Sequence, residues 1–381
     1  MNGVKYFDHA ATTQMDNEVL NEMLPYLTNN YGNASSIYSL GRMAKEGILL
    51  AKMRTAASIN SKTNEIYFTS GGSESDNLAI KGIALANSRY GNHIITSKIE
   101  HPAVINTCKS LEKMGYRVTY LPVDEFGRIN IFDLERSINR NTILITIMFA
   151  NNEIGTIQNI KEIGRIAKKY NIIFHTDGVQ AMGNIKIDVR ALNIDSLSMS
   201  AHKFYGPKGV GALYVRNGIR FQKIQDGGHQ ENDKRAGTEN TAGIVGLGKA
   251  LEIADKNLVQ YNEYLRNLSE FYIQEISNKI SNIKINGDMN NKLAGNNNIC
   301  FAGIDGSKLI VELDKRGICA SSGSACSSGF LNPSHVLLAT GVSENLARGS
   351  LRITFGKENT IEDVKFLVDN LQDIINKMRR G

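Results

Sequence analysis

Short apolar runs alternate with longer helical patterns through the first two thirds of the chain, and this alternation constrains the fold more than any other feature. The run at 143–147 has almost no polar face, which is typical of a strand covered on both sides in a parallel sheet. The helical patterns between such runs would supply the covering layers, so the sequence predicts an α/β domain. Strands are predicted at 65–69, 93–97, 117–121, 142–149, 172–176, 196–200 and 211–215, and helices at 77–88, 101–114 and 160–170.

The pattern changes after residue 238. Residues 243–280 form one long amphipathic pattern, and an Asn- and Gly-rich loop is predicted at 286–298 before a compact α+β pattern. A chain of 381 residues also exceeds one ordinary domain. We therefore predict a large domain over 13–255 and a small domain over 256–381. The sequence does not decide whether residues 1–12 pack on the small domain or on the large one.

Composition excludes several classes of protein. The net charge of +6 comes from 44 basic and 38 acidic residues that are spread along the chain, so nucleic-acid binding is not expected. The most apolar run, at 143–150, is far shorter than the ~20 residues that cross a membrane. Four cysteines are too few for a disulfide framework and no signal-peptide pattern is present, so we expect a cytoplasmic protein.

Lys203 follows a predicted strand in the segment Ser200-Ala-His-Lys203. A lysine that bonds covalently to a carbonyl cofactor needs rigid backbone and polar, anion-binding neighbours, and this segment supplies a hydroxyl, an imidazole and nearby glycines. A surface lysine beside a structural histidine is the alternative. That alternative must also account for the strand-terminal carboxylate described next.

Asp177 ends another predicted strand, 26 positions before Lys203. A carboxylate there could pair with the ring nitrogen of pyridoxal phosphate and keep it protonated. Ligands of open α/β sheets bind at the carboxyl ends of strands, where both residues are predicted to lie. A turn or cap role is the usual alternative for an isolated aspartate.

Gly71, Gly72 and Ser73 follow the strand at 65–69 and precede a helix. Backbone amides at a helix start, together with a hydroxyl, can hold a phosphate. The same residues would also make an ordinary turn before a capped helix, so this segment is weak evidence by itself.

Two further residues have chemical potential, Cys326 and Arg352. Cys326 lies on a Ser- and Gly-rich loop that can carry a thiolate to a reacting centre, whereas Cys108 and Cys300 are predicted to be buried and inert. Arg352 lies in a predicted apolar strand, where its planar fork suits a substrate carboxylate. An internal salt bridge is the alternative.

Two other motifs do not support a site. Residues 243–249 match most of a nucleotide-binding P-loop, but Ala250 replaces the required hydroxyl residue and no strand precedes it. Cys319, Cys326 and His335 have no usual zinc spacing and no evident fourth ligand. We therefore expect no resident metal.

Taken together, these segments resemble the cysteine desulfurases of the NifS/IscS type, within the class V aminotransferase group of fold type I enzymes. The resemblance runs over the whole chain. It is carried by residues 6–13 (YFDHAATT), 71–77 (GGSESDN), 100–103 (EHPA), 151–155 (NNEIG), 175–180 (HTDGVQ), 200–203 (SAHK), 235–240 (RAGTEN) and 322–327 (SGSACS). It implies a large, mainly parallel mixed sheet with a smaller α+β domain.

The resemblance also implies a pyridoxal 5′-phosphate site. Lys203 would hold the cofactor and move the substrate Cα proton, Asp177 would pair with the ring nitrogen, and His101 would stack on the ring. The remaining implied cofactor contacts are Gly72, Ser73, Asn152, Gln180, Ser200, His202 and, from a partner subunit, Thr238. Shared sites of this kind imply a two-fold homodimer.

The implied reaction converts L-cysteine to L-alanine. Asn152 and Arg352 would hold the substrate carboxylate, and Cys326 would receive the sulfur as a persulfide. The sulfur acceptor would be an iron–sulfur scaffold protein or another acceptor, and Cys326 would meet a nascent cluster only transiently on such a partner. A selenocysteine lyase or another class V aminotransferase is the nearest alternative, and a non-catalytic sulfur carrier is a more distant one.

Overall fold

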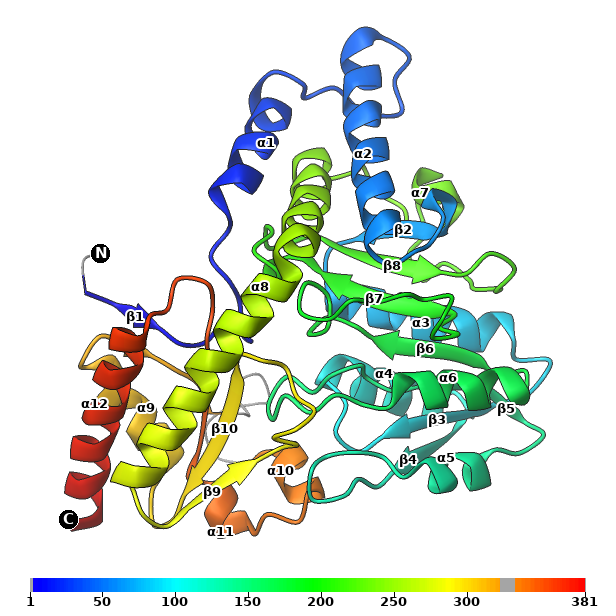
Figure 1. Ribbon diagram of the computed structural model, residues 1–381. Coiled ribbons are helices and arrows are strands. Elements are labelled where there is room, and N and C mark those ends of the chain that lie inside the picture. Colours follow the sequence, from blue (N-terminus) through cyan, green and yellow to red (C-terminus); the bar gives the residue numbers. More distant parts are fainter. Residues whose placement is uncertain (1–2, 323–332, 381) are drawn as a thin grey trace.

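The computed structural model describes residues 3–322 and 333–380, and a seven-stranded sheet occupies its centre (Figure 1). The strand order is β2-β8-β7-β6-β5-β3-β4, and only β8 runs antiparallel to its neighbours. The predicted mainly parallel mixed sheet is therefore confirmed. The strands are β2 (Ile66–Thr69), β3 (His93–Ser97), β4 (Arg117–Leu121), β5 (Thr142–Thr146), β6 (Ile173–Asp177), β7 (Ser196–Ser200) and β8 (Gly211–Val215).

Two apolar layers cover this sheet, because consecutive strand residues point to opposite faces. Ile94 and Leu144 belong to a cluster with α3 (Gly72–Ala86) and α4 (Pro102–Glu112). Ile95 and Ile145 belong to the other cluster, together with side chains of further helices. Among these are α1 (Asn17–Thr28), α2 (Ser39–Ser58), α6 (Ile160–Lys169) and the first part of α8 (Thr241–Lys279).

A smaller antiparallel sheet, β12-β10-β9, forms the second core. Its strands are β9 (Ile283–Asn286), β10 (Asn296–Phe301) and β12 (Ser350–Thr354), packed by α9 (Gly306–Asp314), α12 (Ile361–Arg380) and the end of α8. The remaining helices are α5 (Ile131–Ser137), α7 (Gln230–Asp233), α10 (His335–Ala339) and α11 (Glu344–Ala347). In the described part of the chain, no helix is both long and apolar enough to span a membrane.

Helix α8 connects the two cores without a break (Figure 1). Leu251 packs in the core of the large sheet, whereas Leu265 and Tyr272 pack in the core of the small one. The domain boundary at residue 255 falls between these positions and stays a prediction, since one helix runs through it.

The N-terminal segment contacts both parts of the molecule. Strand β1 (Lys5–Tyr6) pairs in parallel with β11 (Ile318–Cys319), and Asp8 bridges to Thr354 of β12. A few residues later, Thr13 donates its backbone N–H to the His202 carbonyl beside the large sheet, at 2.9 Å. Residues 5–13 therefore link the edge of the large sheet to the small sheet.

Several boundaries differ from the sequence predictions. The predicted loop at 286–298 is wrong at both ends, because Asn286 lies in β9 and 296–298 lie in β10. Asparagine disfavours strands, but these amides are buried and bonded to one another: Asn286 Nδ2 donates to Asn298 Oδ1 at 2.7 Å. The helix predicted over 77–88 begins earlier, at Gly72, which agrees with the helix start near Ser73 that the two glycines indicate, and α1, α2 and α12 were not among the predicted helices.

Candidate active site

Asp177 and Lys203 lie at the carboxyl ends of two adjacent parallel strands, as the sequence predicts. Asp177 is the last residue of β6, it is 6% exposed, and its Oδ1 accepts the Val179 N–H at 2.9 Å. Lys203 ends the short helix Ala201–Lys203 that follows β7. Its Nζ donates to the carbonyls of Ala10 and Ala11 at 2.6 and 2.7 Å, so the N-terminal segment closes one side of the site.

His101 caps the start of α4 and faces the same cluster. Its Nδ1 accepts the Ala103 N–H at 3.1 Å, which leaves the proton of the neutral ring on Nε2. Ligand atoms of His101, Asp177 and Asp76 all lie within 4.8 Å of one another. Burial lowers the pKa of His101, which Asp177 opposes and Lys203 reinforces, so a neutral imidazole lies beside Asp177.

Acidic groups gather around this cluster. Burial raises the pKa of Asp177, and His101 and Lys203 oppose that rise. Burial raises the pKa of Glu100 to about 8, although Ser97 Oγ and the Met148 N–H donate to its carboxylate. No role for Glu100 or Asp76 is predicted from the sequence. A signal for Asp76 existed, because it precedes Ile80 and Ile83 by four and seven residues and so shares the buried face of α3.

The start of α3 forms a cradle for an anion. The 15-residue helix has no side-chain N-cap, so its first amides are available to a ligand. Gly71 has φ +153°, and a Cβ on Gly72 would lie 2.7 Å from Val179 Cγ2. A Cβ on either glycine would lie within 3.7 Å of Ser200 side-chain atoms, so the cradle and Ser200 adjoin. Ser73 is exposed at the same helix end.

Three other predicted cofactor contacts, Gln180, His202 and Thr238, differ in burial and in their hydrogen-bond partners. Gln180 is buried and its Nε2 donates to the Ala10 carbonyl at 3.0 Å. His202 Nδ1 lies 3.1 Å from Thr12 Oγ1, and burial lowers the pKa of His202 to about 4. Thr238 lies exposed between α7 and α8. A role for Thr238 across a subunit interface stays a prediction.

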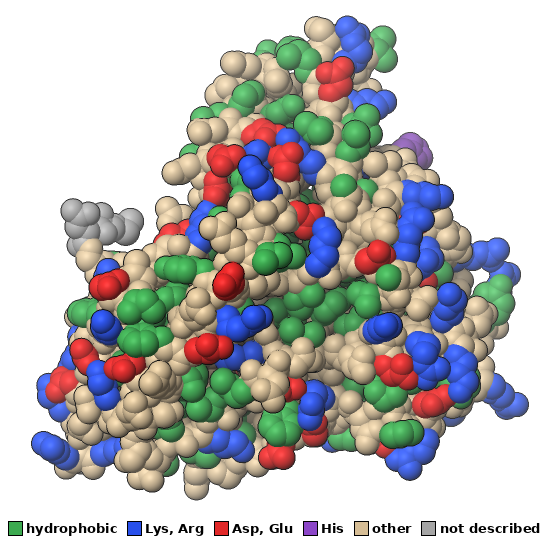
Figure 2. All heavy atoms as spheres, viewed as in Figure 1, with side chains coloured by type: hydrophobic (Ala, Val, Ile, Leu, Met, Phe, Trp, Pro, Cys, Tyr) green, Lys and Arg blue, Asp and Glu red, His purple; other side chains and the backbone are tan. Residues whose placement is uncertain are grey.

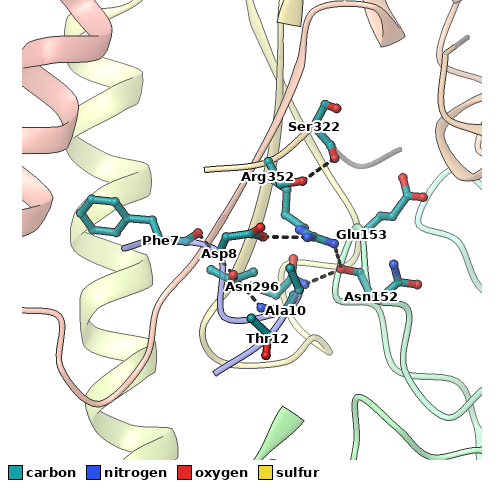
Figure 3. Close-up of polar contacts among 12 residues, drawn as sticks. Phe7, Asp8, Ala10, Thr12, Asn152, Glu153, Asn296, Ser322 and Arg352 are labelled. Atoms are coloured by element: carbon teal, nitrogen blue, oxygen red, sulfur yellow. Dashed lines mark hydrogen bonds and ion pairs between the residues drawn. The ribbon is translucent and has the colours of Figure 1, made fainter. Parts of the chain in front are cut away.

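Arg352 lies between Asp8 and Asn152, as Figure 3 shows. Its side chain is buried, Nη2 lies 2.7 Å from Asp8 Oδ1, and Nη1 donates to the Asn152 carbonyl at 3.0 Å. Among the residues that the structure describes, Nε has no hydrogen-bond partner. The internal salt bridge considered from sequence is thus present, and binding of a substrate carboxylate stays a prediction.

Glu153 follows Asn152 and is also buried. Its Oε2 accepts a hydrogen bond from Ser334 Oγ at 2.5 Å. Burial raises the pKa of Glu153 to about 7, and the Ser334 hydroxyl and Arg352 oppose the rise. Cys326 lies outside the described residues, which resume at residue 333, just before Ser334.

The donors of this site suit one kind of ligand. Its anionic end would bind at the start of α3 and Ser200, a protonated ring nitrogen would face Asp177, and a carbonyl carbon would be within the reach of Lys203. The neutral imidazole of His101 offers a flat surface for such a ring.

Comparison with known proteins identifies the family to which the chain is similar. The family model described as aminotransferase class-V matches residues 5–367. The cysteine desulfurase IscS of Clostridium botulinum (strain Hall) is 54% identical over all of this chain and 96% of its own length. The cysteine desulfurase IscS of Methanosarcina thermophila is 52% identical over 99% of this chain and 93% of its own length.

Solved structures agree with these relatives. A NifS-like protein superposes with a TM-score of 0.93 at 36% identity, covering 98% of this chain and all of the other. A structure described as SspA in complex with cysteine superposes with a TM-score of 0.83 at 40% identity, covering 92% of this chain and 98% of the other.

Proposed function

Since this chain belongs to the aminotransferase class-V family, in its group of NifS/IscS-type cysteine desulfurases, we propose that it is a pyridoxal-phosphate-dependent cysteine desulfurase. It converts L-cysteine to L-alanine and keeps the sulfur as a persulfide on Cys326. The observation that carries this function is that Asp177 and His101 lie together and that Lys203 shifts the pKa of both, on a chain that also has the glycine cradle and is 54% identical to an IscS relative.

The residues present fit pyridoxal phosphate. Gly72, Ser73, Ser200 and His202 would hold its phosphate, with Thr238 of a second copy. Lys203, Asp177, Gln180, Asn152 and His101 would hold its ring. When bound, the cofactor supplies an electron sink that stabilises negative charge at the substrate Cα.

The substrate carboxylate is assigned to Arg352 and Asn152. Arg352 is fixed by Asp8 and by the Asn152 carbonyl, so its guanidinium need not reorganise when cysteine arrives. The Nε–H is among the donors left for a substrate oxygen, because among the described residues it has no other acceptor. Lys203 Nζ then removes the Cα proton, while His101 holds a proton at Nε2.

Sulfur transfer is assigned to Cys326. Its thiolate attacks the substrate sulfur, the S–S bond forms, and the Cβ–S bond breaks. Cβ gains the proton that the Cys326 thiol has lost and Lys203 returns the proton to Cα, so alanine leaves and Cys326 carries the persulfide. A scaffold protein for iron–sulfur clusters would then take the terminal sulfur.

The homodimer is part of the same proposal. Helices α1 and α2 project from the large sheet, and Figure 2 shows hydrophobic side chains over that projection. Leu24 and Leu27 of α1 and Leu49 and Met53 of α2 are all more than 45% exposed. Apolar surface of this kind favours association with a second copy. A second copy would also bring its Thr238 loop to the site.

The test is a spectrum of the purified protein followed by an assay with L-cysteine and a thiol reductant. We expect an absorption band of bound cofactor and equal amounts of sulfide and alanine. Cofactor without sulfide would instead indicate another class-V aminotransferase. Protein that neither contains nor takes up the cofactor would refute the proposal.

A further inference from the structure

A second buried aspartate, Asp76, lies behind Asp177. It is 1% exposed on the inner face of α3, and its nearest carboxylate oxygen is within 4.8 Å of Asp177 and of His101. Neither the substrate nor the sulfur step described above uses it. A buried carboxyl beside the carboxylate that faces the cofactor ring needs a physical explanation, since two adjacent buried anions repel.

The hydrogen bonds around the two carboxyls are unequal. Asp177 Oδ1 accepts the Val179 N–H, and both Lys203 and His101 favour its charge. Asp76 is bonded to the Ser198 hydroxyl, but among the described residues its Oδ1 has no hydrogen-bond partner. Donors stabilise an anion, so the proton that one carboxyl must keep resides on Asp76.

An ion pair with His175 is the competing explanation. His175 Nε2 lies 3.7 Å from Asp76 Oδ1, which is too long for a hydrogen bond. Both nitrogens of His175 are already bonded, Nδ1 to Thr146 Oγ1 at 2.8 Å and Nε2 to Ser198 Oγ at 3.0 Å. The ring is fully buried, and burial lowers its pKa to about 3. His175 is therefore neutral and does not neutralise an Asp76 anion.

The charges of the groups that face Asp76 also favour a protonated Asp76. They are His175 and Asp177 from β6, Ser198 from β7, and Glu100 and His101 from the loop after β3. Lys203 is the lysine among the groups that shift the pKa values of Asp177 and His101, whereas burial lowers the pKa of His101 and of His335, the other basic groups that act there. One cation matches one carboxylate, and burial raises the pKa of Asp76 well above its usual range.

We propose that Asp76 is a positioning residue that stays protonated, so that Asp177 is the single carboxylate offered to the cofactor ring nitrogen. The Ser198 hydroxyl that bonds to Asp76 is itself held by His175, whose other ring nitrogen bonds to Thr146, so these side chains fix the orientation of the Asp76 carboxyl. This inference rests on the proposed function, because it assigns the ring nitrogen to Asp177.

The first test measures cofactor affinity, by titrating cofactor-free protein with pyridoxal phosphate and following bound absorbance. Asp76→Asn replaces the protonated carboxyl with a neutral group of the same shape, so we expect its dissociation constant to stay within about threefold of wild type. Asp76→Ala removes the carboxyl that bonds to Ser198 and leaves a gap behind Asp177, and Asp177→Asn removes the anion, so each should weaken binding by at least about tenfold.

The second test needs no cofactor, because it compares the unfolding of cofactor-free Asp76→Asn and wild type. A buried acid with a raised pKa binds its proton more tightly in the folded state, so it loses stability as pH rises above the usual pKa of an aspartate. Asparagine carries no such proton. The stability of Asp76→Asn relative to wild type should therefore increase between about pH 5 and about pH 8.

Two outcomes would overturn the proposal. One is Asp76→Asn binding the cofactor as weakly as Asp177→Asn, since Asp76 would then act as an anion. The other is a relative stability of Asp76→Asn that stays flat or falls with pH. Failure of the proposed function is recognised separately, because Asp177→Asn would then bind pyridoxal phosphate as wild type does.

Discussion

The two polar centres of this molecule differ in how their charged groups are arranged. At the edge of the large sheet, Asp76 and Asp177 are buried close together with neutral histidines, and burial raises the pKa of each carboxyl. At the small sheet, Arg352 and Asp8 form a direct ion pair of 2.7 Å. The first centre suits a ligand with a protonated, positively charged group, which can pair with a buried carboxylate. The second suits a ligand that only needs a fixed cation, as a substrate carboxylate does.

The largest expected effect tests the first centre. In the proposed function, Lys203→Ala removes the amine assigned to hold the cofactor and to move the Cα proton, so desulfuration should fall by at least about 10³-fold. Absorbance of bound cofactor should change as well. Lys208→Ala is a matched control, because Lys208 is exposed five residues later and has no assigned role. Equal losses in both variants would show that general damage to the segment, and not Lys203, causes the effect.

The next effect tests the second centre. Arg352→Ala should raise KM for cysteine by about 10²-fold and should destabilise the fold by about 3 kcal/mol, because Asp8 is left without its partner. Arg352→Lys keeps the charge but loses the planar fork, so it should recover stability better than KM.

A double-mutant cycle with Asp8→Ala checks that coupling. The double variant should be less destabilised than the sum of the single variants, since neither partner is left alone. Strict additivity of the two unfolding free energies would contradict the coupling. The ion pair at the small sheet would then not stabilise the fold, and the two centres would no longer differ in this respect.

The two centres also differ in how well the sequence predicts them. Asp177 and Lys203 are predictable because Asp177 ends a strand and Lys203 follows the end of another, and the carboxyl ends of adjacent parallel strands meet at one edge. The partner of Arg352 is not predictable in this way. Asp8 lies 344 residues earlier in the chain, and an N-terminal segment bridging both sheets brings the two together.

The strands of the fold also differ in how well the sequence predicts them. The apolar strands of the large sheet are predictable from their own residues, because a run without a polar face must be covered on both sides. Strand β10 is not, since its asparagines indicate a loop until their burial against Ser269 and Glu153 supplies partners for the amides. Tertiary contacts decide such a segment, and local propensity does not.

Glu153 combines features of both centres, because it lies near Arg352 and burial nevertheless raises the pKa of its carboxyl. Burial raises its pKa from 4.5 to about 7, so the folded state binds its proton more tightly than the unfolded state does. Wild type should lose stability from this group as pH rises from about 4.5 to about 7, by roughly 2–3 kcal/mol. Glu153→Gln should lack this loss in urea unfolding at several pH values. A parallel pH dependence in both proteins would show that Glu153 is ionised in the fold.

The smallest expected change in stability comes from two helix-cap variants, which test whether the two sheets unfold together. Asn130 caps α5 beside the large sheet, with Oδ1 accepting the Phe132 N–H at 2.8 Å, and Asp305 caps α9 beside the small one, with Oδ1 accepting the Ser307 N–H at 2.9 Å. Replacing either by alanine should cost about 1 kcal/mol, and serine should restore most of it. Because α8 contributes Leu251 to one core and Leu265 to the other, we expect both variants to shift one calorimetric transition. Two transitions, each shifted by only one of the variants, would instead show that the sheets are separate folding units and that α8 breaks between them.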